Sequence, residues 1–202
     1  MSAAGESVEA RILSVALAHV RRDGLGRLTI VRVADEAGMT HANVYRYFRS
    51  KTDLADHLLS DWLRDLERRL GDITQSPDPA DDKLERFLTL LARSYAEKAA
   101  GDGHVFALLT DALDAGRITG LRHRQRVRDL LVRVIEEGVG TRLLAGMDVR
   151  RIEHLVFDVL HRFIDPHAVA RDRGQEGAAA PGESRRERAT RLLVRGLVAG
   201  RS

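Results

Sequence analysis

The chain contains no cysteine among its 202 residues. Disulfide bonds, thiolate zinc sites and thiol nucleophiles are therefore excluded, and the composition suits a reducing compartment. The chain also lacks any apolar run near the roughly 18 to 20 residues that a membrane-spanning helix needs. Its first residues have neither the basic start nor the apolar core of a signal peptide. We therefore expect a cytoplasmic protein.

Aromatic residues are scarce as well, at 4% of the chain, and alternation of aromatic and β-branched residues is rare. Apolar residues recur instead at spacings of three and four, which predicts α-helices throughout. Hydrophobic residues make up 44% of the chain, which is enough for a packed core. The formal net charge is +3, a small excess that is compatible with an anionic partner.

Three short helices are expected near the N-terminus. Apolar residues on one face predict the first helix over 9–22, and Gly24 ends it. Thr29 is a suitable N-cap for a second helix that ends at Gly38, and Thr40 is a suitable N-cap for the third. This order of helix, tight turn and helix predicts a helix-turn-helix, which places its last helix in the major groove of DNA.

The rest of the chain is predicted to form longer helices. Residues 50–53 (Ser-Lys-Thr-Asp) form a capping box that opens a fourth helix, which runs to about residue 70 with its leucines facing inward. The segment 71–82 contains Ser-Pro-Asp-Pro and should separate two blocks, and the small and polar stretch 169–185 should form a loop. Five more helices are expected near 80–99, 103–114, 120–144, 148–165 and 184–199. The glycines expected at their joints are Gly101, Gly103, Gly116, Gly120 and Gly146.

The polar face of the third helix carries groups that suit DNA. Hydroxyl groups donate hydrogen bonds to phosphate oxygens from short side chains. Asn43 and Arg46 have the geometry for paired contacts with the edges of adenine and guanine. Val44 and Phe48 fall on the opposite face and should pack against Ala34, Ala37 and Met39 to hold the helix in place. Lys51 is well placed for a phosphate beside the groove.

These residues resemble the N-terminal domain of the tetracycline-repressor (TetR) family of bacterial transcription regulators over 10–58. The resemblance rests on Ile12-Leu-x-x-Ala16, Gly24, Thr29, Val33-Ala34, Ala37-Gly38, Val44-Tyr45-x-Tyr47-Phe48 and Ser50-Lys51-x-x-Leu54. It implies backbone contacts to DNA from Thr29, Thr40, Asn43, Tyr45, Tyr47 and Lys51. The chain departs from the commonest family pattern at His41, Ala42 and Tyr47, where lysine, glycine and histidine are frequent. The candidate DNA-binding residues are therefore Thr29, Arg32, Thr40, His41, Ala42, Asn43, Tyr45, Arg46, Tyr47 and Lys51.

The helix-turn-helix pattern also occurs as a plain packing motif, in which the aromatic residues of the third helix would be core. The ordered set of motif matches favours DNA binding. We predict an all-α protein with a helix-turn-helix DNA-binding domain over 8–54 and a helical ligand-binding and dimerisation domain over 55–202. We expect a sequence-specific transcription regulator that binds a two-fold operator. Repression is the usual activity in the family.

The last two expected helices of the body carry apolar stripes that suit a homodimer. The candidate dimerisation residues are Leu155, Val159, Phe163, Leu193 and Leu197. Two such helices from each subunit would form a four-helix bundle between copies, although the stripes would also suit packing within one subunit. Dimerisation is favoured because one small head has too few contacts for specific affinity.

A small organic effector is the other partner expected for the body, because members of the family usually bind one there. The large side chains that would line its pocket are Trp62, Phe87, Tyr95, Phe106, Leu109 and Phe157. The same residues would serve equally as ordinary core. Polar anchors would come from His123, Arg126 or His161.

Neither a metal site nor an enzyme active site is expected. His154 and His161 share a helix face but lie seven residues apart, about 10 Å, which is too far for one metal ion. The sequence has no Gly-x-Ser-x-Gly elbow and no phosphate-cradling glycine loop. We therefore predict no cofactor. The alternatives are a regulator without a small-molecule effector, which a tightly packed body would favour, and a helical enzyme, which would turn over a substrate without DNA.

Overall fold

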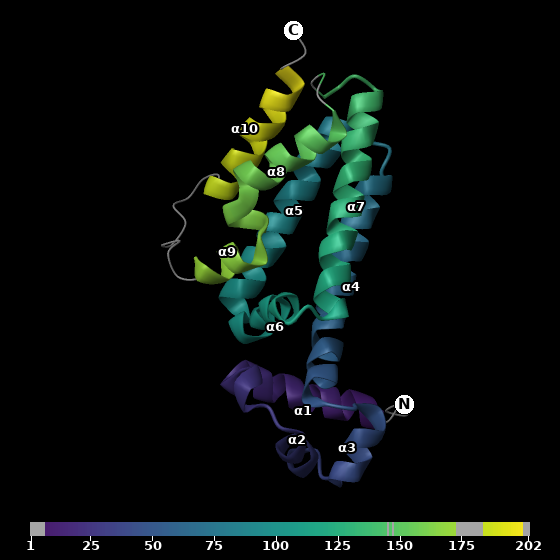
Figure 1. Cartoon of the computed structure of the whole chain (residues 1–202), viewed down its shortest axis with the longest axis vertical. Coiled ribbons are helices and arrows are strands. Elements are labelled where there is room, and N and C mark those ends of the chain that lie inside the picture. Colours follow the sequence, from purple (N-terminus) through teal and green to yellow (C-terminus); the bar gives the residue numbers. More distant parts are fainter. Residues whose placement is uncertain (1–6, 145, 147, 173–183, 200–202) are drawn as a thin grey trace, which may run out of the picture.

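The structure, a computed structural model, describes residues 7–144, 146, 148–172 and 184–199. Figure 1 shows an elongated molecule in which α1, α2 and α3 form a small head at one end. The long helix α4 leaves this head and runs into a larger body that contains α5 to α10. The described residues form helices and no strand, so the prediction of an all-α fold is confirmed for them.

The head contains three α-helices and one short turn of 3-10 helix. These elements are α1 (Val8–Asp23), the 3-10 turn (Leu25–Arg27), α2 (Ile30–Glu36) and α3 (His41–Tyr47). The sequence pattern predicted the α-helices but not the 3-10 turn. Gly24 and Gly38 have φ angles of 75° and 65°, a left-handed conformation that favours glycine. Gly24 directly follows the end of α1, and Gly38 lies in the turn between α2 and α3.

The core of the head holds α3 in place. Val44 and Phe48 are buried on the inner face of this helix, as predicted, together with Ala34 and Ala37 from the end of α2. Met39 is partly buried against them. A seven-residue helix has little stability of its own, so this packing fixes the position of α3 and leaves its other face free.

Helix α4 spans Lys51–Gln75 and connects the head to the body. The predicted capping box is present, because the Ser50 hydroxyl oxygen accepts a hydrogen bond from the Asp53 amide at 3.0 Å. The predicted end near residue 70 is wrong, since the helix continues through Gly71. A glycine within a helix costs only about 1 kcal/mol, and the burial of Ile73 in the following turn offsets this cost. The leucines predicted to face inward are all buried, namely Leu54, Leu58, Leu63, Leu66 and Leu70.

The expected boundary between residues 54 and 55 falls within this unbroken helix, and it stays a prediction. A connection at 76–79, shorter than the expected break over 71–82, leads from α4 into the rest of the body. Its helices are α5 (Ala80–Gly101), α6 (Gly103–Asp114), α7 (Ile118–Gly140), α8 (Val149–Ile164), α9 (Pro166–Arg171) and α10 (Arg185–Ala199). None of the described helices is both long and apolar enough to cross a membrane.

The helices of the body pack around a common apolar core. Helix α5 contacts α4, α7, α8 and α10, and it is therefore central to the body. Helix α6 lies at the end of the body that faces the head, where it contacts α1 (Figure 1). The head and the body are thus joined both by α4 and by the contact between α1 and α6.

The body departs from the sequence prediction at α9. The expected helix over 148–165 ends at Ile164, and the chain that was expected to form a loop from residue 169 is helical as far as Arg171. Asp165 caps this short helix by accepting a hydrogen bond from the Ala168 amide at 2.9 Å, and Pro166 occupies its first turn. The remainder of the predicted loop, over 173–183, lies outside the described residues.

Two glycines of α7 act through packing rather than as helix ends. Gly120 is buried in the first turn, where an added Cβ would lie 3.1 Å from the Cβ of Ala112 on α6. At the other end the helix stops at Gly140 instead of residue 144, and Leu144 folds back over Gly138. An added Cβ at Gly138 would lie 2.5 Å from Leu144 Cδ1, so the missing side chain makes room for this leucine.

Candidate nucleic-acid interface

The outer face of α3 presents most of the predicted interface to solvent. Tyr45 and Tyr47 are 54% and 41% exposed, which is unusual for large aromatic side chains. Arg46 is also exposed, and Asn43 is partly exposed. The alternative that both tyrosines belong to the core of the head is therefore wrong, while Phe48 does belong to it.

The two threonines of the interface cap the helices on which it stands. The Thr29 hydroxyl oxygen accepts a hydrogen bond from the Arg32 amide, and the Thr40 hydroxyl oxygen accepts one from the Asn43 amide, both at 3.3 Å. A hydroxyl group that accepts in this way keeps its own hydrogen for another acceptor. Both threonines are exposed, so each is able to donate to a phosphate oxygen while it caps its helix.

Lys51, the first residue of α4, lies beside these helices and is partly buried. Its amino group donates a hydrogen bond to the Gly26 carbonyl oxygen at 3.3 Å. This contact ties the start of α4 to the 3-10 turn that precedes α2. An ammonium group has three hydrogens, so Lys51 retains donors for an anion.

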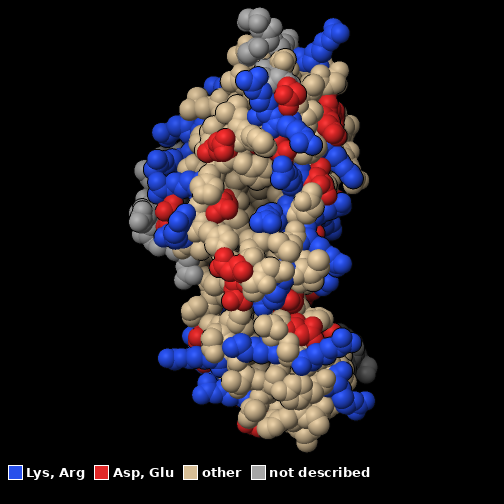
Figure 2. All heavy atoms as spheres, viewed as in Figure 1, with Lys and Arg blue, Asp and Glu red and all other residues tan. Residues whose placement is uncertain are grey.

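The charges near α3 are basic or arranged in pairs. Among the described residues, Arg32 and Arg46 form no ion pair with a carboxylate, whereas His41 lies 3.7 Å from Asp35. Figure 2 shows basic side chains around the sides of the head, with mainly uncharged groups over its lower end, where α2 and α3 lie. At a DNA interface, hydroxyl and amide groups would therefore make the central contacts, and arginines would make contacts at the edges.

A buried histidine supports the turn of the helix-turn-helix and escaped the sequence prediction. His19 of α1 is 1% exposed, and its Nε2 atom lies 3.0 Å from the Glu36 carboxylate at the end of α2. Arg22 donates to the other ring nitrogen at 3.1 Å. The available signal was position, because residue 19 continues the spacing of the buried residues Ile12 and Ala16.

Ion pairs join the head to the body. Arg21 of α1 lies 2.9 Å from Asp102, and the His104 ring donates to the Arg21 carbonyl oxygen at 2.9 Å. Arg117 at the start of α7 lies 3.3 Å from Asp56 in the second turn of α4. Burial raises the pKa of Asp56, and the neighbouring Arg117 guanidinium opposes this shift. The body therefore contacts both α1 and the beginning of α4.

The predicted effector residues gather in the core of the body. The rings of Trp62, Tyr95 and Phe106 pack with centroid separations of 5.7 to 6.2 Å. Phe87 and Leu109 are fully buried, and Phe157 packs against the core with part of its surface exposed. The structure thus brings three of the six side chains into one aromatic cluster. Their role in binding an effector stays a prediction.

A cleft that the sequence did not predict lies between α5, α8, α9 and α10. It has a volume of about 560 Å³. Alanines of α5 line one side, and the predicted dimerisation residue Phe163 and Val169 line another. Arg162 and Asp172 form an ion pair at 2.5 Å on its wall. This combination of apolar surface and a few charged groups is typical of binding sites for small organic molecules.

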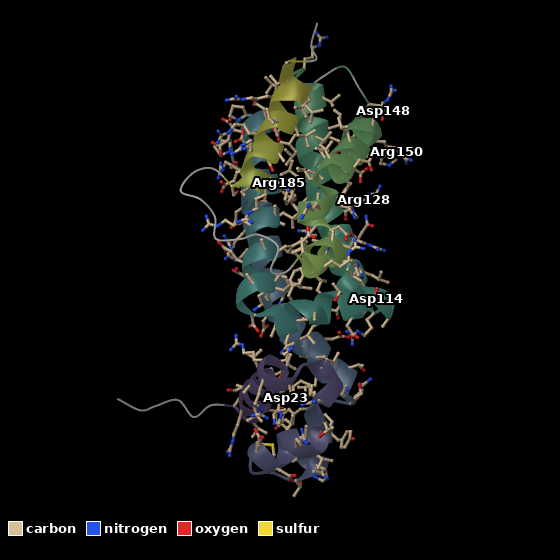
Figure 3. The ribbon with its side chains drawn as sticks, turned by 90° about the vertical axis from the view of Figure 1, so that its left-hand side faces the viewer. Asp23, Asp114, Arg128, Asp148, Arg150 and Arg185 are labelled. Atoms are coloured by element: carbon tan, nitrogen blue, oxygen red, sulfur yellow. The ribbon has the colours of Figure 1, made fainter. Side chains whose placement is uncertain are left out.

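Helices α8 and α10 together present an exposed apolar face. In Figure 3, α8 begins at the top, near Asp148 and Arg150, and runs downward, whereas α10 begins lower down, at Arg185, and runs upward. The two helices therefore run in opposite directions. A groove of about 500 Å³ between them is lined by Leu155, Val159, Ala189, Leu192, Leu193, Gly196 and Leu197. Leu155, Val159 and Leu192 are 36%, 47% and 64% exposed. Leu193 and Leu197 are mostly buried within the subunit and form the floor of the groove.

No cluster of three or more potential metal ligands occurs within the part of the chain that the structure describes. His154 and His161 both lie exposed on α8. His123 is different, because it is buried and contacts Glu67 and Tyr95.

Comparison with known families accounts for both parts of the chain. Residues 12–58 match the family of bacterial regulatory proteins known as the tetR family. Residues 80–183, about half of the chain, match the C-terminal domain of tetracyclin repressor-like proteins.

Individual relatives are more distant. The nucleoid occlusion factor SlmA of Yersinia enterocolitica is 32% identical over 111 residues, which are 52% of this chain and 55% of that protein. The chain thus spans little more than half the length of this relative. A regulator of the TetR/AcrR family from Thermobifida fusca has the same fold, with a TM-score of 0.72, 21% identity and coverage of 93% of this chain and 97% of its own.

The fold is shared with a further solved structure that contains a ligand. FadR from Bacillus subtilis, in complex with stearoyl-CoA, has a TM-score of 0.62 and 17% identity, and the match covers 94% of this chain and 97% of FadR.

Proposed function

We propose that this chain, which belongs to the tetracycline-repressor family and is a DNA-binding transcriptional regulator, acts as a homodimeric repressor of a two-fold operator and responds to a small organic effector. A chromosomal target implies that it works in the bacterial cytoplasm. The observation that carries the proposal is the outer face of α3, where two exposed tyrosines, an arginine and a capping threonine stand together.

DNA recognition would divide between backbone and base contacts. Thr29, Thr40, Tyr45 and Lys51 offer hydroxyl and ammonium hydrogens to phosphate oxygens, which fix the register of the head on the duplex. Asn43, Arg46 and the neighbouring positions 41 and 42 would face the base edges, and Tyr47 would add a contact to the backbone. Arg32, which is exposed at the start of α2 and forms no ion pair with the residues that the structure describes, would add a further phosphate contact.

Dimerisation is proposed through the exposed face of α8 and α10. A two-fold arrangement would bury Leu155, Val159 and Leu192 of both copies against one another, over the floor formed by Leu193 and Leu197. Phe163 lies farther along α8 at the cleft, where it would contribute to the margin of the interface. Two heads held in this way would read successive half-sites on one side of the duplex.

An effector is proposed because the body contains candidate space for one and because a protein of the same fold, FadR, is known with stearoyl-CoA. Two places are candidates, the aromatic cluster around Trp62 and the cleft beside Phe163. An effector would release DNA only if it binds more tightly to a conformation whose heads no longer match the half-sites.

The test of DNA recognition is capture of fragmented genomic DNA from the source organism on the purified protein. We expect enrichment of one two-fold sequence, with binding that weakens as salt is raised and is weaker in Tyr45→Ala. A folded dimer that enriches no sequence at low salt would contradict the assignment of α3 as the recognition helix.

The test of the effector uses the captured duplex and stearoyl-CoA as the first probe. Release by stearoyl-CoA but not by coenzyme A would identify the acyl chain as the recognised part. Release by neither compound would reject acyl-CoA as the effector and leave DNA recognition unaffected.

A further inference from the structure

A buried histidine in the body connects three helices through two hydrogen bonds. His123 of α7 is 2% exposed. Its Nδ1 atom lies 2.7 Å from the Glu67 carboxylate of α4, and its Nε2 atom lies 2.8 Å from the Tyr95 hydroxyl of α5. Neither the DNA interface nor the apolar face of α8 and α10 makes use of these groups.

The donors and acceptors in this network define the protonation state of the ring. A carboxylate only accepts hydrogen bonds, so His123 Nδ1 carries a hydrogen and donates it to Glu67. In the neutral ring Nε2 then accepts, and the Tyr95 hydroxyl donates to it. Burial raises the pKa of Tyr95, and the charges of Glu67 and Asp165 raise it further, so the hydroxyl keeps its hydrogen. With neutral His123, the donors and acceptors of these two contacts are matched.

Protonation of His123 would break this match on one side only. Both ring nitrogens would then be donors, which strengthens the contact with Glu67. The Tyr95 oxygen would have to accept from Nε2, and the hydroxyl hydrogen would lose its buried acceptor. Tyr95 is 3% exposed, so water has little access to replace the lost partner.

Other charged groups near the network are occupied or exposed. Lys98 of α5 lies over the Trp62 ring and pairs with Asp102 at 3.2 Å. On α7 itself, Arg122, Arg124 and Arg126 are exposed. The titratable groups of α6 have partners elsewhere: His104 bonds to Arg21, Asp111 to Arg117 and Asp114 to His167. Glu153 of α8 pairs with Arg128. Glu67 is therefore the carboxylate that acts directly on His123.

The position of the network relates it to the DNA-binding head. Glu67 lies on α4, sixteen residues after Lys51, which corresponds to about 24 Å along one continuous helix. Tyr95 packs against Trp62 of the same helix and against Phe106 of α6, the helix that contacts α1. A shift of Tyr95 would therefore act on both connections between the body and the head.

We propose that His123 is a proton-sensitive positioning residue, whose neutral form holds α4 against α5 and α7 and whose protonation displaces Tyr95 and weakens DNA binding. The last step rests on the proposed function, whereas the displacement of Tyr95 does not. The two steps are therefore tested by different measurements.

Trp62 provides the first measurement, because it is the only tryptophan in the chain and its ring lies 6.2 Å from that of Tyr95. We expect its fluorescence to change in one transition as the pH is lowered from 8 to 5. The transition should disappear in His123→Gln. It should remain in His167→Gln, a matched control that removes a histidine bonded to a carboxylate, Asp114, at 2.8 Å.

Two further variants keep the test decisive if His123→Gln does not fold. Glu67→Gln should move the transition to lower pH by at least about 0.5 units, because the charge that favours the protonated ring is gone. Tyr95→Phe should move it to higher pH by a similar amount, because no hydroxyl group then requires Nε2 as an acceptor. A purely structural role would lower stability in both variants without shifting the midpoint in opposite directions.

DNA affinity provides the second measurement, with the captured duplex at constant salt. We expect the affinity of the wild type to fall between pH 8 and pH 6. This loss should be at least about fivefold larger than the loss in Tyr95→Phe, because protonation displaces no hydroxyl group in that variant. An absent fluorescence transition, or one that persists in folded His123→Gln, would overturn the proposal. A transition without any DNA binding at either pH would instead contradict the proposed function, and equal pH dependence in both proteins would overturn the link to DNA.

Discussion

Two faces of the molecule expose large side chains, and they differ in chemistry. On α3 the exposed groups are Tyr45 and Tyr47, whose rings end in hydroxyl groups. On α8 and α10 they are Leu155, Val159 and Leu192, which have no polar atom in their side chains. A tyrosine forms contacts at low cost in conformational entropy and also makes a hydrogen bond, so it suits a wet, polar partner. An exposed aliphatic group gains free energy only where another apolar surface covers it.

The difference explains why one molecule should carry two separate interfaces. The face on α3 is small and stands on a seven-residue helix, and its polar groups remain satisfied by water when DNA is absent. The face on α8 and α10 leaves apolar surface in water unless a second copy covers it. The faces lie at opposite ends of the molecule (Figure 1). A variant in either face should therefore affect its own interface directly. A variant in the face on α8 and α10 should affect DNA binding only because it changes how many heads are held together.

The largest effect is expected from a charge in the apolar face. Leu192→Asp would place two carboxylates in a two-fold interface, one from each copy, and should weaken dimerisation at least about 100-fold, near 3 kcal/mol. Sedimentation velocity over a range of concentrations measures this change. Ile118→Asp is the matched control, because Ile118 is also an exposed aliphatic residue but belongs to α7. Loss of the dimer in both variants, or in neither, would contradict the proposed interface.

A smaller effect is expected from the base-reading side chains. Arg46→Ala and Asn43→Ala should each cost about 1 to 3 kcal/mol of binding to the preferred sequence and less for other sequences. Competition binding with single-base variants of the captured duplex would reveal this loss of preference. Arg64→Ala provides the control, since Arg64 is an exposed arginine of α4 that pairs with Asp61 in the body. A uniform loss across all sequences would reassign Asn43 and Arg46 to the DNA backbone.

The backbone contacts should give a uniform and more modest effect. Tyr45→Ala and Lys51→Ala are expected to weaken binding to all duplexes about tenfold, and Lys51→Ala should also reduce the slope of affinity against salt by about 1. Salt titrations of duplex binding measure both quantities. Tyr45→Phe separates the ring from the hydroxyl group. Full affinity in Tyr45→Phe would mean that the ring rather than a hydrogen bond makes the contact.

The head was predictable because its determinants are local. Thr29, Thr40 and Ser50 each cap the helix that begins one residue later, and the pattern of buried residues within each helix spans only a few turns. Glycine was less reliable, since the same residue type has several uses. Gly24 ends a helix, Gly71 lies within one, and Gly120 allows two helices to approach. Sequence alone does not distinguish these environments, because they depend on distant neighbours.

The polar network of the body shows the same limit more strongly. His123 pairs with residues 28 and 56 positions away, so no local spacing predicts their meeting. The cleft beside Phe163 similarly requires four helices to come together. The short helix α9 was a different case, because Asp165 followed by Pro166 is a local start signal that had been available in the sequence.

The smallest effect tests how far the exposed face of α3 depends on its cap. Thr40→Ala removes the hydroxyl group that accepts from the Asn43 amide and should destabilise α3 by about 1 kcal/mol. Hydrogen exchange of the α3 amides should accelerate about fivefold, whereas exchange in α8 and α10 should stay unchanged, since those helices are stabilised by their own packing. Thr40→Ser keeps the hydroxyl group and should restore slow exchange. Equal acceleration in the body would show that the head does not open independently, and the two faces would then share one unit of stability.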